Sequence, residues 1–126
     1  MRRLSFTVGL VVLFTVVLAA CNVNAGSGSA TISLGASSFT GTTTATIKAG
    51  ESLTFDDSSG GTHHLVTGTN GQFSAASGAP SEFSTSAGLD LTPGDKKTVT
   101  FPTAGTYPIT CTIHPSMQAT ITVTAG

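Results

Sequence analysis

The residue types with the clearest capacity for chemistry gather in one short stretch near the C-terminus. Cys111, His114 and Met117 follow one another at intervals of three residues, so a thiol, an imidazole and a thioether share one tight loop. Thiolate and thioether are soft ligands and imidazole is borderline, a set suited to copper in both of its oxidation states. Calcium and magnesium require oxygen ligands, which this set does not provide. The loop therefore predicts a copper site.

A fourth ligand has to come from another part of the chain. The remaining histidines, His63 and His64, are adjacent and begin a segment of strand-like sequence. Adjacent residues of a strand point to opposite faces, so only one of the two imidazoles can enter a site on the core side. The hydrophobic pattern does not separate them, because His63 shares a face with Leu65 and His64 shares a face with Val66.

Cysteine usage gives a second reason to consider a metal. The chain contains two cysteines, Cys21 and Cys111. If Cys21 is lipidated, Cys111 has no disulfide partner in an exported protein, where thiols tend to oxidise. Metal ligation accounts for such a thiol. The alternative is that Cys111 is a small buried hydrophobe.

The N-terminal segment has the organisation of a secretory signal peptide. Two arginines precede an apolar stretch that ends in small residues at Cys21. This ending is similar to the bacterial lipobox, in which the cysteine is diacylated and becomes the first residue of the mature protein. Residues 1–20 are thus predicted to be a signal peptide with a lipobox, and Cys21 the lipidation site. An uncleaved membrane helix is the alternative, because the apolar run approaches the length that spans a bilayer.

Downstream of this leader the sequence predicts one domain on a tether. Residues 21–29 are small and polar, which suits a flexible tether, and residues 30–126 form the predicted domain. Removal of residues 1–20 leaves 106 residues, enough for a single compact domain. Three lysines and six acidic residues remain, so the formal charge is about −3. With no basic patch to neutralise phosphates, nucleic acid is not a predicted partner.

The domain itself has an all-β pattern. Short alternating or β-branched segments are separated by Gly, Pro, Asn and Asp, and no amphipathic helix is evident, which is typical of a two-sheet β-sandwich. Alternation places Cys111 and Met117 on the apolar faces of their strands. The segment 69–94 is longer than an ordinary connection and is expected to cover one end of the sandwich in part. The predicted strands are residues 30–34, 43–48, 52–56, 63–67, 97–101, 105–111 and 117–124.

Motifs of common enzyme classes are not found in the sequence. It has no nucleophile elbow, phosphate-binding loop or Cys-x2-Cys pair. Asp56 and Asp57 form the one acidic pair, and the Ser and Gly residues that follow them indicate turn formers and not a catalytic dyad.

Two segments resemble the copper-binding segments of the cupredoxins. Residues 105–117 are similar to the C-terminal copper loop of plastocyanin-like and amicyanin-like proteins, and the Cys-x2-His-x2-Met spacing is closest to amicyanin. Residues 62–66 are similar to the family's Pro-His-Asn-Val segment, which supplies the first ligand. The resemblance covers most of residues 42–124. It implies a Greek-key β-sandwich of the cupredoxin type, with about seven to eight strands, that closes over copper at one end.

The resemblance also implies roles for individual residues. His63 and His114 would be equatorial imidazoles, Cys111 the thiolate and Met117 a long, weak axial thioether. His64 stands where the family usually has an Asn that helps to tie the ligand loops together. The segment 69–94 does not match the short plastocyanin arrangement, so the resemblance implies nothing about a particular partner.

The function predicted from these observations is electron transfer by a type 1, or blue, copper ion that cycles between Cu2+ and Cu+. Protein side chains would fill every ligand position, so neither an enzymatic activity nor a small-molecule substrate is predicted. The partners would be redox proteins met at a membrane surface. Alternatives are a copper trafficking or storage protein with the same ligands, and a metal-free β-sandwich interaction module.

The predicted leader also implies a location. An exported protein with a lipid on Cys21 would be anchored to the cell envelope through the membrane. The site would be the outer face of the cytoplasmic membrane or the periplasmic and outer-membrane region.

Overall fold

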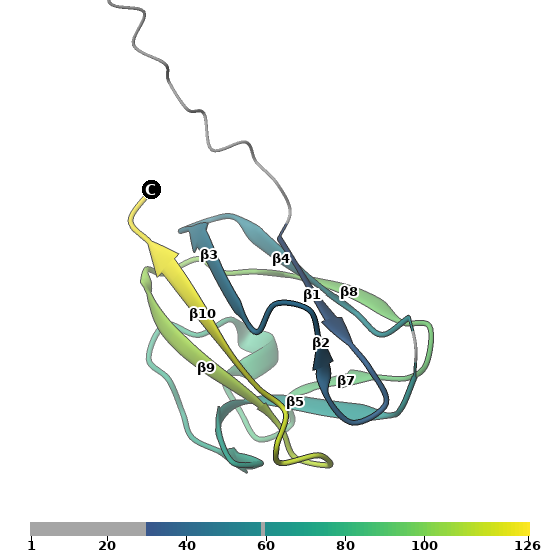
Figure 1. Cartoon of the computed structure of the whole chain (residues 1–126). Coiled ribbons are helices and arrows are strands. Elements are labelled where there is room, and N and C mark those ends of the chain that lie inside the picture. Colours follow the sequence, from purple (N-terminus) through teal and green to yellow (C-terminus); the bar gives the residue numbers. More distant parts are fainter. Residues whose placement is uncertain (1–29, 59) are drawn as a thin grey trace, which may run out of the picture.

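The computed structural model describes residues 30–58 and 60–126, which form two β-sheets packed face to face (Figure 1). The predicted signal peptide, Cys21 and the tether lie outside these residues. No helix in the described part of the chain is long and apolar enough to cross a membrane.

Each sheet combines strands from distant parts of the sequence. The first sheet has the spatial order β2 (Phe39–Thr40), β1 (Ala30–Leu34), β4 (Ser52–Asp56) and β8 (Lys96–Thr100). The second has the order β3 (Thr44–Lys48), β10 (Gln118–Thr124), β9 (Gly105–Cys111), β5 (His63–Thr69) and β6 (Gln72–Phe73), while β7 (Leu89–Leu91) pairs with β5. Pairing is antiparallel except between β1 and β4 and between β3 and β10.

The β-sandwich predicted from alternation is confirmed, but the predicted number of strands was too low. All seven predicted strands are present, with ends that differ by at most two residues, and the described residues hold ten strands in total. The additional strands, β2, β6 and β7, have two or three residues each. Segments this short carry no periodic hydrophobic pattern, so only pairing with a longer strand defines them.

The register between β5 and β9 determines where His63 lies relative to the loop after Cys111. Leu65 of β5 lies opposite Cys111, the last residue of β9. Because the strands are antiparallel, His63 continues past the end of β9 and lies level with the loop 112–117. That loop links β9 to β10 and is the yellow-green segment at the lower edge of Figure 1.

Burial follows the predicted alternation in β10 but not in β5. Leu65, Val66 and Thr67 are all fully buried, so both faces of β5 are covered. The segment 69–94 provides this cover: a Cβ at Gly88 would lie 2.8 Å from the Val66 side chain, and Thr67 Oγ1 donates a hydrogen bond to the carbonyl of Phe83 at 3.0 Å. The segment therefore does more than cover the sandwich, because parts of it are packed into it.

Phe83 is the deepest residue of this segment. It belongs to the 3-10 turn η1 (Ser81–Phe83) and is completely buried. Its ring lies edge-on against Phe55 at a centroid distance of 5.6 Å and continues to Phe101 at 6.2 Å. The ring of Phe83 thus anchors the segment in the core, a role that was not predicted from the sequence.

Tyr107 holds the first half of β9 in place through ring packing and hydrogen bonds. Its ring packs on Phe101 at 5.7 Å. Its hydroxyl has one hydrogen to share between two carbonyl oxygens, that of Thr103 at 2.8 Å and that of Gly78 at 3.2 Å. A buried tyrosine bonded to a carbonyl a few residues upstream is a known corner device of β-sandwiches. Here it also connects the strand that carries Cys111 to the segment 69–94.

Candidate metal centre

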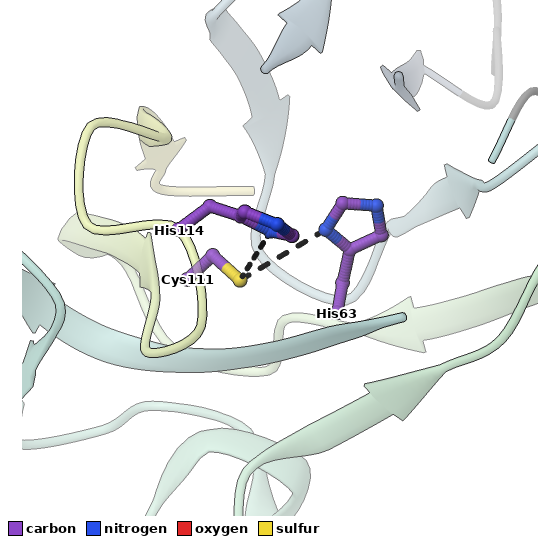
Figure 2. Close-up of side chains that lie close together, drawn as sticks. All are labelled: His63, Cys111 and His114. Carbon is purple, nitrogen blue, oxygen red and sulfur yellow. Dashed lines mark hydrogen bonds between the residues drawn. The ribbon is translucent and has the colours of Figure 1, made fainter. Parts of the chain in front are cut away.

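Three ligand-type side chains converge at one end of the second sheet (Figure 2). His63 is the first residue of β5, Cys111 is the last residue of β9, and His114 lies in the loop that follows. The Sγ of Cys111 is 3.9 Å from Nδ1 of His63 and 3.9 Å from Nδ1 of His114. One ligand atom from each residue lies within 4.8 Å of the others.

These distances suit a shared metal ion. Donor atoms bound to one ion at about 2.0 to 2.3 Å are roughly 3.5 to 4 Å apart, which is the separation between the thiol sulfur and each imidazole nitrogen. The donors are one thiolate and two imidazoles, a soft and borderline set that fits copper. The residues present therefore fit the predicted ion without a large rearrangement.

The centre is buried on one side and open on the other. His63 and Cys111 have no exposed surface, whereas His114 is partly exposed. The neighbouring Ile113 is 51% exposed, and it is the one large hydrophobic side chain that stands exposed among the described residues. Of the three residues, His114 is therefore the one that reaches solvent, next to the exposed Ile113.

Main-chain hydrogen bonds close the ligand loop at Met117. The Met117 carbonyl accepts from the Cys111 N–H at 3.2 Å and from Thr110 Oγ1 at 3.1 Å, and the Met117 N–H donates to the His114 carbonyl at 2.9 Å. The side chain is 1% exposed. The loop therefore returns Met117 to the core side directly beside Cys111, on the face that alternation predicted.

His64 points away from the centre. Its Nδ1 lies 2.6 Å from Oδ1 of Asp90 in β7, and its Nε2 lies 3.0 Å from the carbonyl oxygen of Ser86. The hydrogen bond with Asp90 raises the pKa of His64 above the ordinary value, and partial burial opposes this shift. Both ring nitrogens have partners, so the structure places His63 and not His64 beside Cys111.

The main chain of His64 ties the two ligand segments together, a role that the resemblance to cupredoxins assigns to an Asn side chain. Its carbonyl accepts a hydrogen bond from the Thr112 N–H at 2.9 Å, which ties the start of β5 to the ligand loop. The side chain instead holds the segment 69–94 against β5. His64, which replaces the Asn usual at this position, therefore contacts the segment 69–94, which also differs from the plastocyanin arrangement.

The structure corrects the interpretation of Asp56 and Asp57 as turn formers. Asp56 ends β4 and forms an ion pair with Lys96 at 2.8 Å. Asp57 is completely buried, and its Oδ1 lies 3.8 Å from Nε2 of His63. Sequence reasoning missed this contact, because the polar residues around Asp57 gave no sign that its side chain turns inward.

A tight turn supports the ligand loop from outside. Asn70 and Gly71, with φ of +53° and +75°, connect β5 to β6. The Gly71 N–H donates to Oγ1 of Thr110 at 2.9 Å, and a Cβ at Gly71 would come within 2.8 Å of the Pro115 ring. Glycine is therefore required here both by backbone conformation and by the approach of the ligand loop.

Comparison with known proteins agrees with the geometry. The profile of the copper binding proteins of the plastocyanin/azurin family matches residues 25–124. Solved structures of similar fold include a mutant of amicyanin in its reduced state, with a TM-score of 0.56 and 21% identity over 78% of this chain and 84% of that chain. Another is amicyanin from Paracoccus versutus (Thiobacillus versutus), with a TM-score of 0.54 and 22% identity over 78% and 83%. Curated protein sequences give no match.

The two adjacent histidines give a direct test of the site geometry. Copper-loaded His63→Ala should lose its blue absorption, because it lacks one of the two nitrogen atoms beside Cys111. His64→Ala should keep the absorption and lose about 1 to 3 kcal/mol of unfolding free energy through its two missing hydrogen bonds. Visible spectra and urea unfolding of both variants measure these effects. The reverse spectral pattern would show that the wrong histidine has been assigned.

The contact between Gly71 and Pro115 predicts a spectral change from a residue that is not a ligand. Gly71→Ala and Gly50→Ala both place a Cβ at positive φ, which should cost each variant roughly 1 to 2 kcal/mol of stability. Only Gly71→Ala also pushes on the ligand loop, since a Cβ at Gly50 has no neighbour within 4 Å. The copper spectrum should therefore shift in Gly71→Ala alone. Identical electron paramagnetic resonance spectra for both variants would contradict this support role.

Proposed function

The chain belongs to the plastocyanin/azurin family of copper-binding proteins, and from this premise we propose that it carries single electrons between redox proteins through one type 1 copper ion. The observation that carries the proposal is the convergence of two imidazole nitrogens on the Cys111 sulfur, each at 3.9 Å. Bound copper supplies a one-electron couple between Cu2+ and Cu+. The chain supplies the positions of the donor atoms.

We assign four ligands to the ion. Three ligands form the inner set: Nδ1 of His63, Nδ1 of His114 and the thiolate of Cys111. The thioether of Met117 is the fourth, weaker ligand. The first three are supported by their mutual distances, and Met117 is supported by its burial and by the hydrogen bonds that return it to Cys111. All four donors belong to the chain, which leaves no ligand position for a substrate, so we propose no enzymatic activity.

The fold suits electron transfer because it restrains the donors. His63 and Cys111 lie on paired strands of one sheet, and three hydrogen bonds close the loop that carries His114. A site held in this way changes little when an electron enters or leaves. The partly exposed His114 ring and the exposed Ile113 offer a short route to a partner protein.

Electron self-exchange distinguishes a carrier from a trafficking or storage protein with the same ligands. In mixtures of reduced and oxidised protein, we expect fast exchange, seen as line broadening in nuclear magnetic resonance, together with slow loss of copper to a chelator. Cys111→Ser should lose the blue colour and the exchange, whereas Cys21→Ser, which replaces the other cysteine of the chain, should keep both. Slow exchange with rapid copper release would favour trafficking, and a chain that ignores added copper would favour a metal-free module.

Met117 should adjust the reduction potential more than it holds the ion, because an axial thioether contact in such sites is long and weak. Met117→Leu should retain copper and colour and should raise the potential, since it removes a donor that favours the oxidised ion. Ile121→Leu, a similar exchange at a buried residue of β10, should leave the potential unchanged. Equal potentials in the Met117 variant and the native protein would count against axial ligation.

The N-terminal pattern supports a further part of the proposal, attachment to the cell envelope through a diacylated Cys21. A lipid anchor would restrict the search for redox partners to the membrane surface. The mature protein should start at Cys21 and carry the mass of the lipid, and Cys21→Ser should release it from the membrane fraction. Intact-mass spectrometry that finds residues 1–20 retained, or Cys21 unmodified, would refute the anchor and leave the copper site unaffected.

A further inference from the structure

A buried carboxyl group faces His63 on the side away from Cys111. The distance between Oδ1 of Asp57 and Nε2 of His63 is 3.8 Å, and neither side chain has any exposed surface. Within the described part of the chain, both oxygens of Asp57 and Nε2 of His63 lack a hydrogen-bond partner. Unpaired polar atoms are costly in a protein interior, and here unpaired atoms of complementary type lie next to one another.

The backbone holds Asp57 in this position. Its N–H donates to the carbonyl of Asp95 at 2.8 Å, and its carbonyl accepts from the N–H of Gly94 at 2.6 Å. The turn that contributes Gly94 and Asp95 is itself closed, because the N–H and Oγ1 of Thr92 both donate to Oδ2 of Asp95 at 2.8 Å. Asp57 is therefore attached on both sides of its main chain to the turn between β7 and β8.

The glycine that precedes this part of β5 allows the close packing around the imidazole. A Cβ at Gly61 would lie 2.6 Å from the Ala36 carbonyl oxygen and 3.5 Å from Nε2 of His63. The loop thus packs directly over the nitrogen, which removes it from solvent. The carboxyl of Asp57 lies within 4 Å of Nε2, at 3.8 Å.

We propose that Asp57 is a positioning residue for the copper ligand His63, an inference that rests on the ligand assignment above. A neutral imidazole carries one proton, so a ring that binds a metal through Nδ1 carries that proton on Nε2. This N–H then donates to the carboxyl of Asp57. The separation of 3.8 Å exceeds the usual hydrogen-bond limit by about 0.6 Å, so the proposal requires the two atoms to approach by that amount when the metal binds.

Such a contact has two consequences for the centre. It fixes the ring orientation, and it makes the ring a better electron donor to the ion, as carboxyl groups behind metal-bound histidines generally do. A better donor favours the oxidised ion over the reduced one. Asp57 therefore lowers the reduction potential through His63, without contacting the metal.

Asp56 provides a matched control for this proposal. It is the adjacent residue and carries the same functional group, but its Oδ2 pairs with Lys96 at 2.8 Å at the edge of the first sheet. Asp56→Asn removes a carboxyl group from nearly the same place in the chain without touching His63. Asp57→Asn keeps the shape of the side chain and leaves a neutral acceptor oxygen. Asp57→Leu has a similar volume and no acceptor.

The test combines a reduction potential with a magnetic resonance signal. In the copper(I) protein, and equally in zinc-loaded protein, nitrogen-edited spectra should show a slowly exchanging Nε2–H of His63. The potential should rise in Asp57→Asn and rise further in Asp57→Leu, where the N–H signal should lose its protection. Asp56→Asn should keep the signal and change the potential less than Asp57→Asn does.

The outcomes separate this inference from the proposed function. Equal potential shifts in Asp56→Asn and Asp57→Asn, or a protected His63 N–H in Asp57→Leu, would overturn the positioning role and leave electron transfer intact. If Asp57→Leu does not fold, the potential of Asp57→Asn compared with that of Asp56→Asn still decides. If electron self-exchange fails in the native protein, the zinc-loaded form still reports on the contact, because it requires no redox change.

Discussion

The antiparallel register between β5 and β9 is the constraint on which the centre depends. With Leu65 opposite Cys111, the chain before Leu65 passes the end of β9 and brings His63 level with the ligand loop. A slip of one residue would exchange the two faces of β5 and present His64 in place of His63. The hydrogen bond from Thr112 to the carbonyl of His64 continues this pairing into the loop. The contact between two segments far apart in sequence is therefore made by strand pairing.

Around this register the fold restrains the centre from several directions. The loop closes on itself through Met117, the turn at Gly71 supports it from outside, and the turn between β7 and β8 holds Asp57 behind His63. The segment 69–94 contributes through Phe83 in the core and through the contact of His64 with Asp90. The segment that departs from the short plastocyanin arrangement therefore helps to support the site.

The sequence predicted the local features well because they depend on periodicity and spacing. The seven longer strands, the sandwich and the inward faces of Cys111 and Met117 all follow from alternation. Alternation could not choose between His63 and His64, because both faces of β5 are buried, one by the core and the other by the segment 69–94 at Gly88. The role of Asp57 was also hidden, since its burial depends on a turn at residues 92–95 that lies far along the chain.

X-ray absorption of the copper-loaded domain in both oxidation states would test the central claim most directly, that the fold imposes one set of donor positions on the ion. We predict one short copper–sulfur bond and two copper–nitrogen bonds in each state, with little change in length on reduction. Loss of the sulfur bond, a change in the number of nitrogen ligands, or a large change in bond lengths between the two states would contradict it.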